Sequence, residues 1–250
     1  CRTSDDWYFS RLDGPVATWI TPELLNEQKR LLPDSAYRRL WLNQWTSAVG
    51  DAISIDDLDA CTTQVGPIPG YMPEFGPYIG GLDLGLKNDR SAFCVVACDV
   101  PKQQIRLAHC ESWAPEQFGG TVSIEAVRQG VVAAHRRFGL SHIFFDPWQA
   151  MHLAERLADN GITMSEWPFT PKNMSRMATE LMRVLRNRTL ILYDDKALHD
   201  DLSRLSIVET QAGFKLVAAR TKAGHADRAM SLAMALPFAV DVSRDLLLYP

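Results

Sequence analysis

The chain has 250 residues, a formal net charge of −4 and near-average shares of apolar and charged side chains. This length is sufficient for one substantial hydrophobic core or two small ones. No apolar run approaches the ~20 residues of a membrane-spanning helix, and the polar and aromatic start of the chain does not resemble a signal peptide, so we expect no membrane association and no secretion.

The cysteines are five in number and include no CxxC pair, which is typical of free thiols in a reducing compartment. Cys94 and Cys98 lie four positions apart in an apolar run, so we expect them to share one face of a buried strand. Acidic side chains outnumber basic ones in residues 1–75, and basic ones outnumber acidic ones in residues 172–228. The basic stretch can follow a phosphate backbone, although a solvated surface of mixed charge explains it equally well.

A run of Pro and Gly in residues 66–77 is unsuited to a helix or a central strand. We therefore divide the chain into a helical segment, 1–75, and a second domain, 76–250. The first segment should contain a helix at Glu23–Leu32, after a Thr21-Pro22 cap. A second helix should begin near Asp34 and present one apolar face that packs on the neighbouring domain, made of Tyr37, Leu40, Trp41 and Trp45.

The second domain opens with three apolar runs joined by short turns, which predict an antiparallel meander of strands at Tyr78–Leu84, Ala92–Asp99 and Ile105–Trp113. An amphipathic helix follows and ends at Gly139. The short apolar run His142–Phe145 is typical of a buried central strand.

A crossover helix, Gln149–Asn160, and a fifth strand, Ile162–Trp167, come next. Such β-α-β steps favour parallel pairing. The sequence therefore predicts an α/β fold with a five-stranded mixed sheet flanked by helices. Beyond it we expect helices near 173–186 and 196–205, an extra β-hairpin over 207–218, and a buried last helix from Asp227 to about Val240.

Three aspartates occupy positions where an unpaired carboxylate costs several kcal/mol of desolvation. Asp83 lies inside the first strand of the meander, Asp146 ends the buried strand, and Asp227 begins the buried last helix. If the strand before Asp146 pairs in parallel beside the strand of Asp83, both carboxylates lie at the same end of the sheet, and the helix start can pack over them. Such oxygen ligands suit one or two Mg²⁺ or Mn²⁺ ions.

Each aspartate also has a structural interpretation. Asp83 could bond backbone amides at a strand end, Asp146 could start a turn before Pro147, and Asp227 could cap its helix. The combination of all three in this order favours a metal site over three separate structural roles. A pair of such ions would support phosphodiester hydrolysis.

Three blocks of sequence together resemble the nuclease domain of tailed-phage terminase large subunits. They are the strand Tyr78–Gly85 with Asp89 and Ser91 after it, the block Phe144-Phe145-Asp146-Pro147-Trp148-Gln149-Ala150, and the block Lys222-Ala223-Gly224-His225-Ala226-Asp227-Arg228-Ala229. The segment Tyr37–Trp45 is similar to the part that joins the family's ATPase motor to its nuclease, so residues 1–75 are interpreted as a linker.

The resemblance implies a ribonuclease H-like fold and a metal-dependent endonuclease that cuts concatemeric double-stranded viral DNA during packaging, in the host cytoplasm. It places Asp83, Asp146 and Asp227 at the family's metal-binding acidic positions, and Lys222 and His225 where they hold phosphate or tune the site. The implied partners are the ATPase domain, the small terminase subunit and the capsid portal. An activated water would attack the phosphodiester and leave a 3′ hydroxyl.

The basic stretch supplies candidate contacts to DNA phosphates that would be largely blind to sequence, namely Arg176, Arg183, Arg204, Lys215 and Arg220. The phosphate loop of an ATPase, GxxxxGK[ST], is absent, so we expect no ATP hydrolysis by this chain. The alternatives are another ribonuclease H-like nuclease, such as a junction resolvase or an integrase-like enzyme, and a non-catalytic module that docks on DNA or a portal. A kinase-like ATPase of the same superfold fits less well, because its glycine loops are missing.

Overall fold

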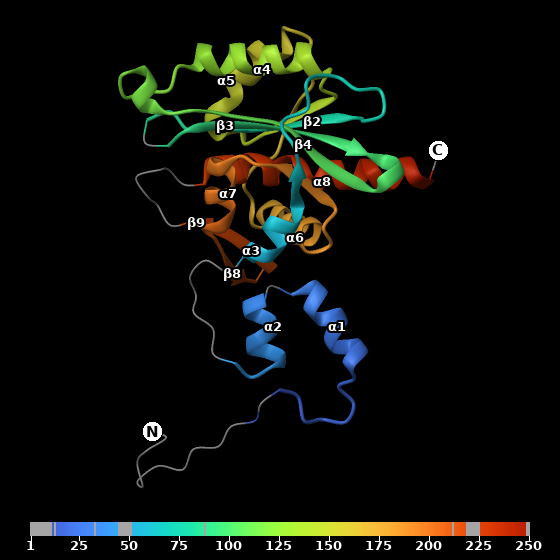
Figure 1. The fold of residues 1–250 in the computed structure, drawn as a ribbon. Helices are drawn as coiled ribbons and strands as arrows, with labels where there is room; N and C mark the ends of the chain where they lie inside the picture. The colour runs from blue at the N-terminus through green and yellow to red at the C-terminus, as the bar shows by residue number, and fades with distance from the viewer. Residues whose placement is uncertain are drawn as a thin grey trace.

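A computed structural model describes residues 12, 14–32, 34–44, 52–87, 89–211, 213–218 and 226–248 (Figure 1). Its centre is a seven-stranded sheet in the order β1-β7-β4-β3-β2-β5-β6. The strands are β1 (Thr62–Gln64), β2 (Tyr78–Asp83), β3 (Ser91–Asp99), β4 (Gln104–Trp113), β5 (His142–Phe145), β6 (Met164–Glu166) and β7 (Leu190–Tyr193).

The five predicted strands are all present, with the predicted pairing. β2, β3 and β4 form the antiparallel meander, β5 pairs in parallel with β2, and β6 pairs in parallel with β5. The predicted number of strands was wrong, because β7 pairs in parallel with β4 and β1 with β7. These two strands have four and three residues, which is too short to show a strand period, and the sheet rather than local preference fixes them.

Helices cover both faces of the sheet (Figure 1). One face carries α4 (Ile124–Phe138) and α5 (Pro147–Ala158), and the other carries α6 (Pro171–Arg186), α7 (Lys196–Ser203) and α8 (Asp227–Leu248). β3 is buried along its whole length, and its alternate residues enter two cores. Phe93 and Val95 pack with α4 and α5, whereas Cys94 and Val96 pack with α6 and α8. Cys94 and Cys98 share the second core, as predicted.

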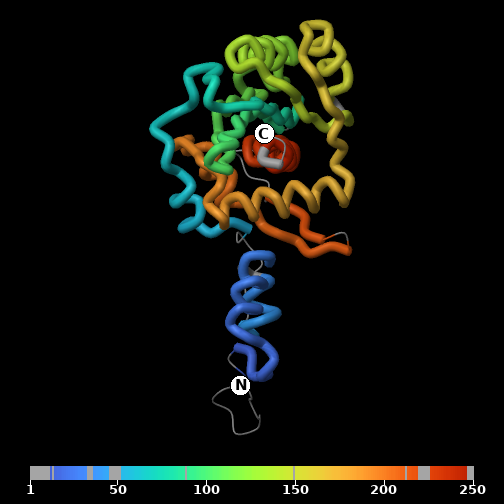
Figure 2. The backbone as a smooth tube through the Cα atoms, turned by 90° about the vertical axis from the view of Figure 1, so that its right-hand side faces the viewer, coloured from blue at the N-terminus to red at the C-terminus, as the bar shows by residue number. Residues whose placement is uncertain are grey.

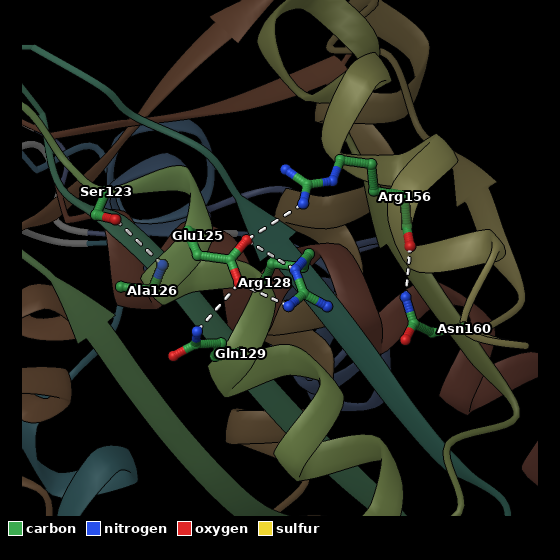
Figure 3. Close-up of polar contacts among 7 residues, drawn as sticks. All are labelled: Ser123, Glu125, Ala126, Arg128, Gln129, Arg156 and Asn160. Carbon is green, nitrogen blue, oxygen red and sulfur yellow. Dashed lines mark hydrogen bonds and ion pairs between the residues drawn. The ribbon is translucent and has the colours of Figure 1, made fainter.

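Glu125 joins α4 to α5 on the outer side of the molecule. Its carboxylate accepts hydrogen bonds of 2.6 Å from Arg128, 3.0 Å from Gln129 and 3.4 Å from Arg156 of α5 (Figure 3). These contacts hold the pKa of Glu125 down at about 2, mainly through Arg128. The bond from Arg156 also holds α5, the helix that starts directly after Asp146, against α4.

The N-terminal helices α1 (Pro22–Leu31) and α2 (Asp34–Trp41) extend away from the body (Figures 1 and 2). Thr21 caps α1 as predicted, accepting from the amide of Leu24. The expected packing of one α2 face is only partly observed, because Tyr37 is buried but Leu40 is 60% exposed. Trp45, the last member of that face, lies outside the described residues.

Part of the predicted linker belongs to the core. The helix α3 (Ile55–Cys61) was not predicted; it buries Leu58 and Cys61 completely and leads directly into β1. The division between residues 75 and 76 stays a prediction, but the packing joins residues 52–64 to the sheet and to α6.

The predicted hairpin is present as β8 (Leu205–Thr210) and β9 (Gly213–Ala218), a separate antiparallel pair. The last helix, α8, runs on past the expected end at Val240 and through Pro237. Short 3-10 turns at Val100–Lys102 and Pro115–Phe118 complete the described elements. In the described ranges, no helix has the length and apolarity needed to span a membrane.

Candidate metal and phosphodiester site

Asp83 and Asp146 lie at the same end of the sheet on neighbouring strands. Leu82 of β2 and Phe145 of β5 are paired in parallel register, and each aspartate directly follows one of them. Asp146 also precedes the first turn of α5, yet its carboxylate caps no backbone amide of that helix. The side chain of Asp146 therefore has no capping role at the start of α5.

The first turns of α8 lie directly against β2. The hydroxyl of Ser231 donates a 2.7 Å hydrogen bond to the carbonyl oxygen of Gly81. A Cβ atom on Gly81 would lie 2.1 Å from the carbonyl oxygen of Ser231, so only glycine allows this approach. Because Asp227 lies one helical turn before Ser231, the contact brings Asp227 to the end of β2.

Asp83 and Asp227 line one open cavity of about 540 Å³, which we call the carboxylate cavity. Asp227 is buried, with 6% of its surface exposed, and Asp83 is partly buried. Asp146 does not line this cavity. The remaining lining residues are Leu84, Gly85, Leu86, Lys87, Asp89, Arg90, Phe169 and Met230.

The aspartates act on one another electrostatically. The pKa of Asp83 is raised from 3.8 to about 8, mainly by burial and then by the negative charges of Asp227, Asp146 and Asp89, in that order. A carboxyl group in such surroundings is destabilised in its charged form until a cation approaches. Asp89 was not predicted as a site residue; its place in a turn two residues before the buried strand β3 gave no distinct signal.

The donor set suits a hard divalent cation, because it consists of carboxylate oxygens. Within the described ranges, no three Asp, Glu, His or Cys side chains lie close enough together to hold a metal ion as they stand. The structure therefore supports the chemistry of the donors and their gathering at one sheet end, while a metal centre in this chain stays a prediction.

Asp201 of α7 fixes the start of α8 and was not predicted from the sequence. Its carboxylate accepts a 3.2 Å hydrogen bond from the backbone amide of Arg228 and a 2.5 Å bond from the guanidinium of Arg204. Burial raises the pKa of Asp201, and its bonds to Arg204 oppose that rise. The available signal was the position of Asp201 on the same face of α7 as the apolar side chains of Leu198 and Leu202.

The predicted DNA-binding residues are found in several settings. Arg176 pairs with Asp241 and lies over the Trp167 ring, Arg183 pairs with Glu180 at 2.7 Å, and Arg204 pairs with Asp201. Lys215 is exposed on β9. Lys222, His225 and Arg220 lie outside the described residues. A role in DNA binding stays a prediction for the whole set.

Solved structures of phage large terminases share this fold. The large terminase nuclease of thermophilic phage G20c, with bound magnesium, aligns with a TM-score of 0.58 and 22% identity, covering 76% of this chain and 98% of that one. The large terminase nuclease domain of Thermus phage P74-26 aligns with a TM-score of 0.55 and 22% identity, covering 72% and 91%.

The chain has the fold of a large terminase nuclease. The ribonuclease H-like fold predicted from the sequence is confirmed, and so is the resemblance to terminase nucleases at the level of the fold. The large terminase of bacteriophage HK97 aligns with a TM-score of 0.62 and 20% identity over 86% of this chain and 49% of that one, so this chain spans about half the length of that structure. No protein-family model and no curated protein matches the sequence.

Proposed function

We propose that this chain is a nuclease that depends on divalent metal ions and cuts double-stranded DNA during phage genome packaging in the host cytoplasm. The observation that carries the proposal is the gathering of Asp83, Asp146 and Asp227 at one end of a sheet with the terminase nuclease fold. The bound magnesium of the G20c nuclease supports a role for divalent ions in this fold.

Asp83, Asp146 and Asp227 would hold one or two Mg²⁺ or Mn²⁺ ions. Bound ions of this kind supply an activated water and stabilise the leaving oxygen of the phosphodiester. The chain's own contribution is positional: β2 and β5 present two carboxylates side by side, and the contact of Ser231 with Gly81 brings the third. Sequence-independent cutting is proposed because contacts to phosphates carry no sequence information.

A plasmid-nicking assay tests the function. The wild-type chain should nick supercoiled DNA with Mn²⁺ or Mg²⁺ and not with EDTA, and Asp83→Asn should lower cutting by more than about a hundredfold, as expected when a metal ligand is lost. Asp159→Asn, an exposed aspartate after the far end of α5, is the matched control and should cut like wild type. A wild-type chain that cuts with no divalent ion, or Asp83→Asn with full activity, contradicts the proposal.

Two other candidates are separated by substrate. A junction resolvase or integrase-like enzyme would prefer a four-way junction or a specific end over linear duplex, and a non-catalytic module would bind DNA or a portal without cutting. Translocation would need an ATPase, which we place in the part of the HK97 large terminase that this chain does not cover. We propose the small terminase subunit and the portal as further partners.

A further inference from the structure

The loop between β2 and β3 forms one wall of the carboxylate cavity and carries two cations. Lys87 and Arg90 line the cavity together with Asp83 and Asp227. Neither was predicted from the sequence, which indicated only a turn here. Two positive side chains beside several aspartates suggest either internal charge balance or a binding site for an external anion.

The backbone of this loop is held in place at several points. The buried hydroxyl of Ser91 donates a 2.8 Å hydrogen bond to the carbonyl oxygen of Gly85. The amide of Val122 donates a 2.8 Å bond to the carbonyl oxygen of Leu86. A Cβ on Gly85 would lie 2.6 Å from the carbonyl oxygen of Arg90, so the two arms of the loop approach closely. These contacts position Lys87 and Arg90 relative to Asp83.

Internal charge balance does not explain the two cations. Among the residues that the structure describes, neither Lys87 nor Arg90 forms an ion pair or a hydrogen bond through its side chain. The arginines of the basic stretch differ, since Arg176, Arg183 and Arg204 each pair with a carboxylate. The cations of the loop therefore remain available for an anion that enters the cavity.

We propose that Lys87 and Arg90 form an anion subsite that binds backbone phosphates of the DNA duplex next to the phosphodiester to be cut. The proposal rests on the proposed function, because a chain of phosphates is the polyanion that would enter this cavity. Arg90 can bind a phosphate through two parallel N–H groups, whereas Lys87 offers a point charge. Both charges would offset the repulsion between the aspartates and the DNA.

The test is the salt dependence of DNA binding. Affinity for a short duplex of mixed sequence is measured by fluorescence anisotropy over a range of salt concentrations, in EDTA so that no cutting consumes the probe. Each lost phosphate contact should reduce the slope of log affinity against log salt by about 1. The variant carrying Lys87→Ala and Arg90→Ala should therefore have a slope shallower by about 2, and Arg90→Lys alone should retain most of the wild-type slope.

The matched control carries Lys102→Ala and Arg136→Ala. Lys102 lies in the turn at the opposite end of β3, with 64% of its side chain exposed, and Arg136 is exposed on α4. A control slope equal to wild type supports the subsite. A wild-type slope in the Lys87/Arg90 variant, or an equal loss in the control, overturns it. If the wild-type chain does not cut DNA but the slopes are as expected, the nuclease function is refuted and the anion subsite is retained.

Discussion

Gly81 and Ser231, 150 positions apart in the chain, are joined by a 2.7 Å hydrogen bond between a hydroxyl and a carbonyl oxygen. Gly81 lies in β2 and Ser231 in α8, where Ser231 is completely buried. This contact sets the distance between β2 and the start of α8, and so between the elements that carry Asp83 and Asp227.

Gly81→Ala should therefore destabilise the protein strongly. The added Cβ would be 2.1 Å from a backbone oxygen, and the helix must move to relieve the overlap, at a cost on the order of 3 kcal/mol. Gly66→Ala is the control, because a Cβ there meets nothing within 4 Å, and its change in unfolding free energy should lie within about 0.5 kcal/mol. Urea unfolding curves of both variants check the difference. Equal stability of the two variants would show that α8 does not depend on this approach.

Without metal, stability should fall as pH rises. The folded-state pKa of Asp83 is about 8 against an ordinary value of 3.8, so the folded protein retains a proton that the unfolded chain releases. The contribution of Asp83 to stability is fully present below about pH 4 and is lost as pH rises through about 8. Asp83→Asn should remove this loss and be more stable than wild type at high pH, by on the order of 2 kcal/mol.

Thermal unfolding in EDTA between acid and mildly alkaline pH measures this difference. The melting temperatures of wild type and Asp83→Asn should be close at the acid end and diverge as pH rises. Parallel curves over the whole range would mean that Asp83 does not titrate in this window.

Divalent ions should stabilise the wild-type chain. An ion that binds only the folded state adds about 2.7 kcal/mol at a concentration one hundred times its dissociation constant. Mg²⁺ or Mn²⁺ should therefore raise the melting temperature of wild type and of Asp159→Asn, but not of Asp83→Asn. A rise of the same size in all three proteins would place the bound ion elsewhere.

Asp201→Asn should reduce both stability and cutting. The substitution weakens the bond to Arg204 and the cap on the Arg228 amide, at a cost of about 2 kcal/mol for a partly buried pair. Because Asp201 acts through the position of Asp227, the loss of cutting should appear under conditions where the variant is still folded. Asp200→Asn, its exposed neighbour, serves as the control. Wild-type cutting by a destabilised Asp201→Asn would limit this residue to a structural role.

Much of the sheet could be predicted because its signals are local. The meander and the β-α-β steps predict that β2 and β5 are neighbours, which places Asp83 beside Asp146, as the structure shows. β1 and β7 could not be predicted in this way, since their few residues form strands only because β7 pairs with the edge of β4 and β1 pairs with β7.

The buried aspartates of the site could be predicted from the sequence, whereas most of the residues around them could not. A carboxylate within an apolar strand is visible in the sequence, as Asp83 is. The pairing of Arg176 with Asp241 is not, because the two residues come from different helices. In the sequence, Lys87 and Arg90 are ordinary turn residues. Only the structure places their positive charges in the wall of the cavity that Asp83 lines.

The placement of Asp227 at the first residue of α8 has a consequence for the order of folding. Asp83 and Asp146 come together as soon as β2 and β5 pair, whereas Asp227 reaches them only when α8 docks on β2 through Ser231 and Gly81. A folding intermediate that has paired β2 with β5 but has not docked α8 would therefore hold two of the three aspartates in place and lack the third.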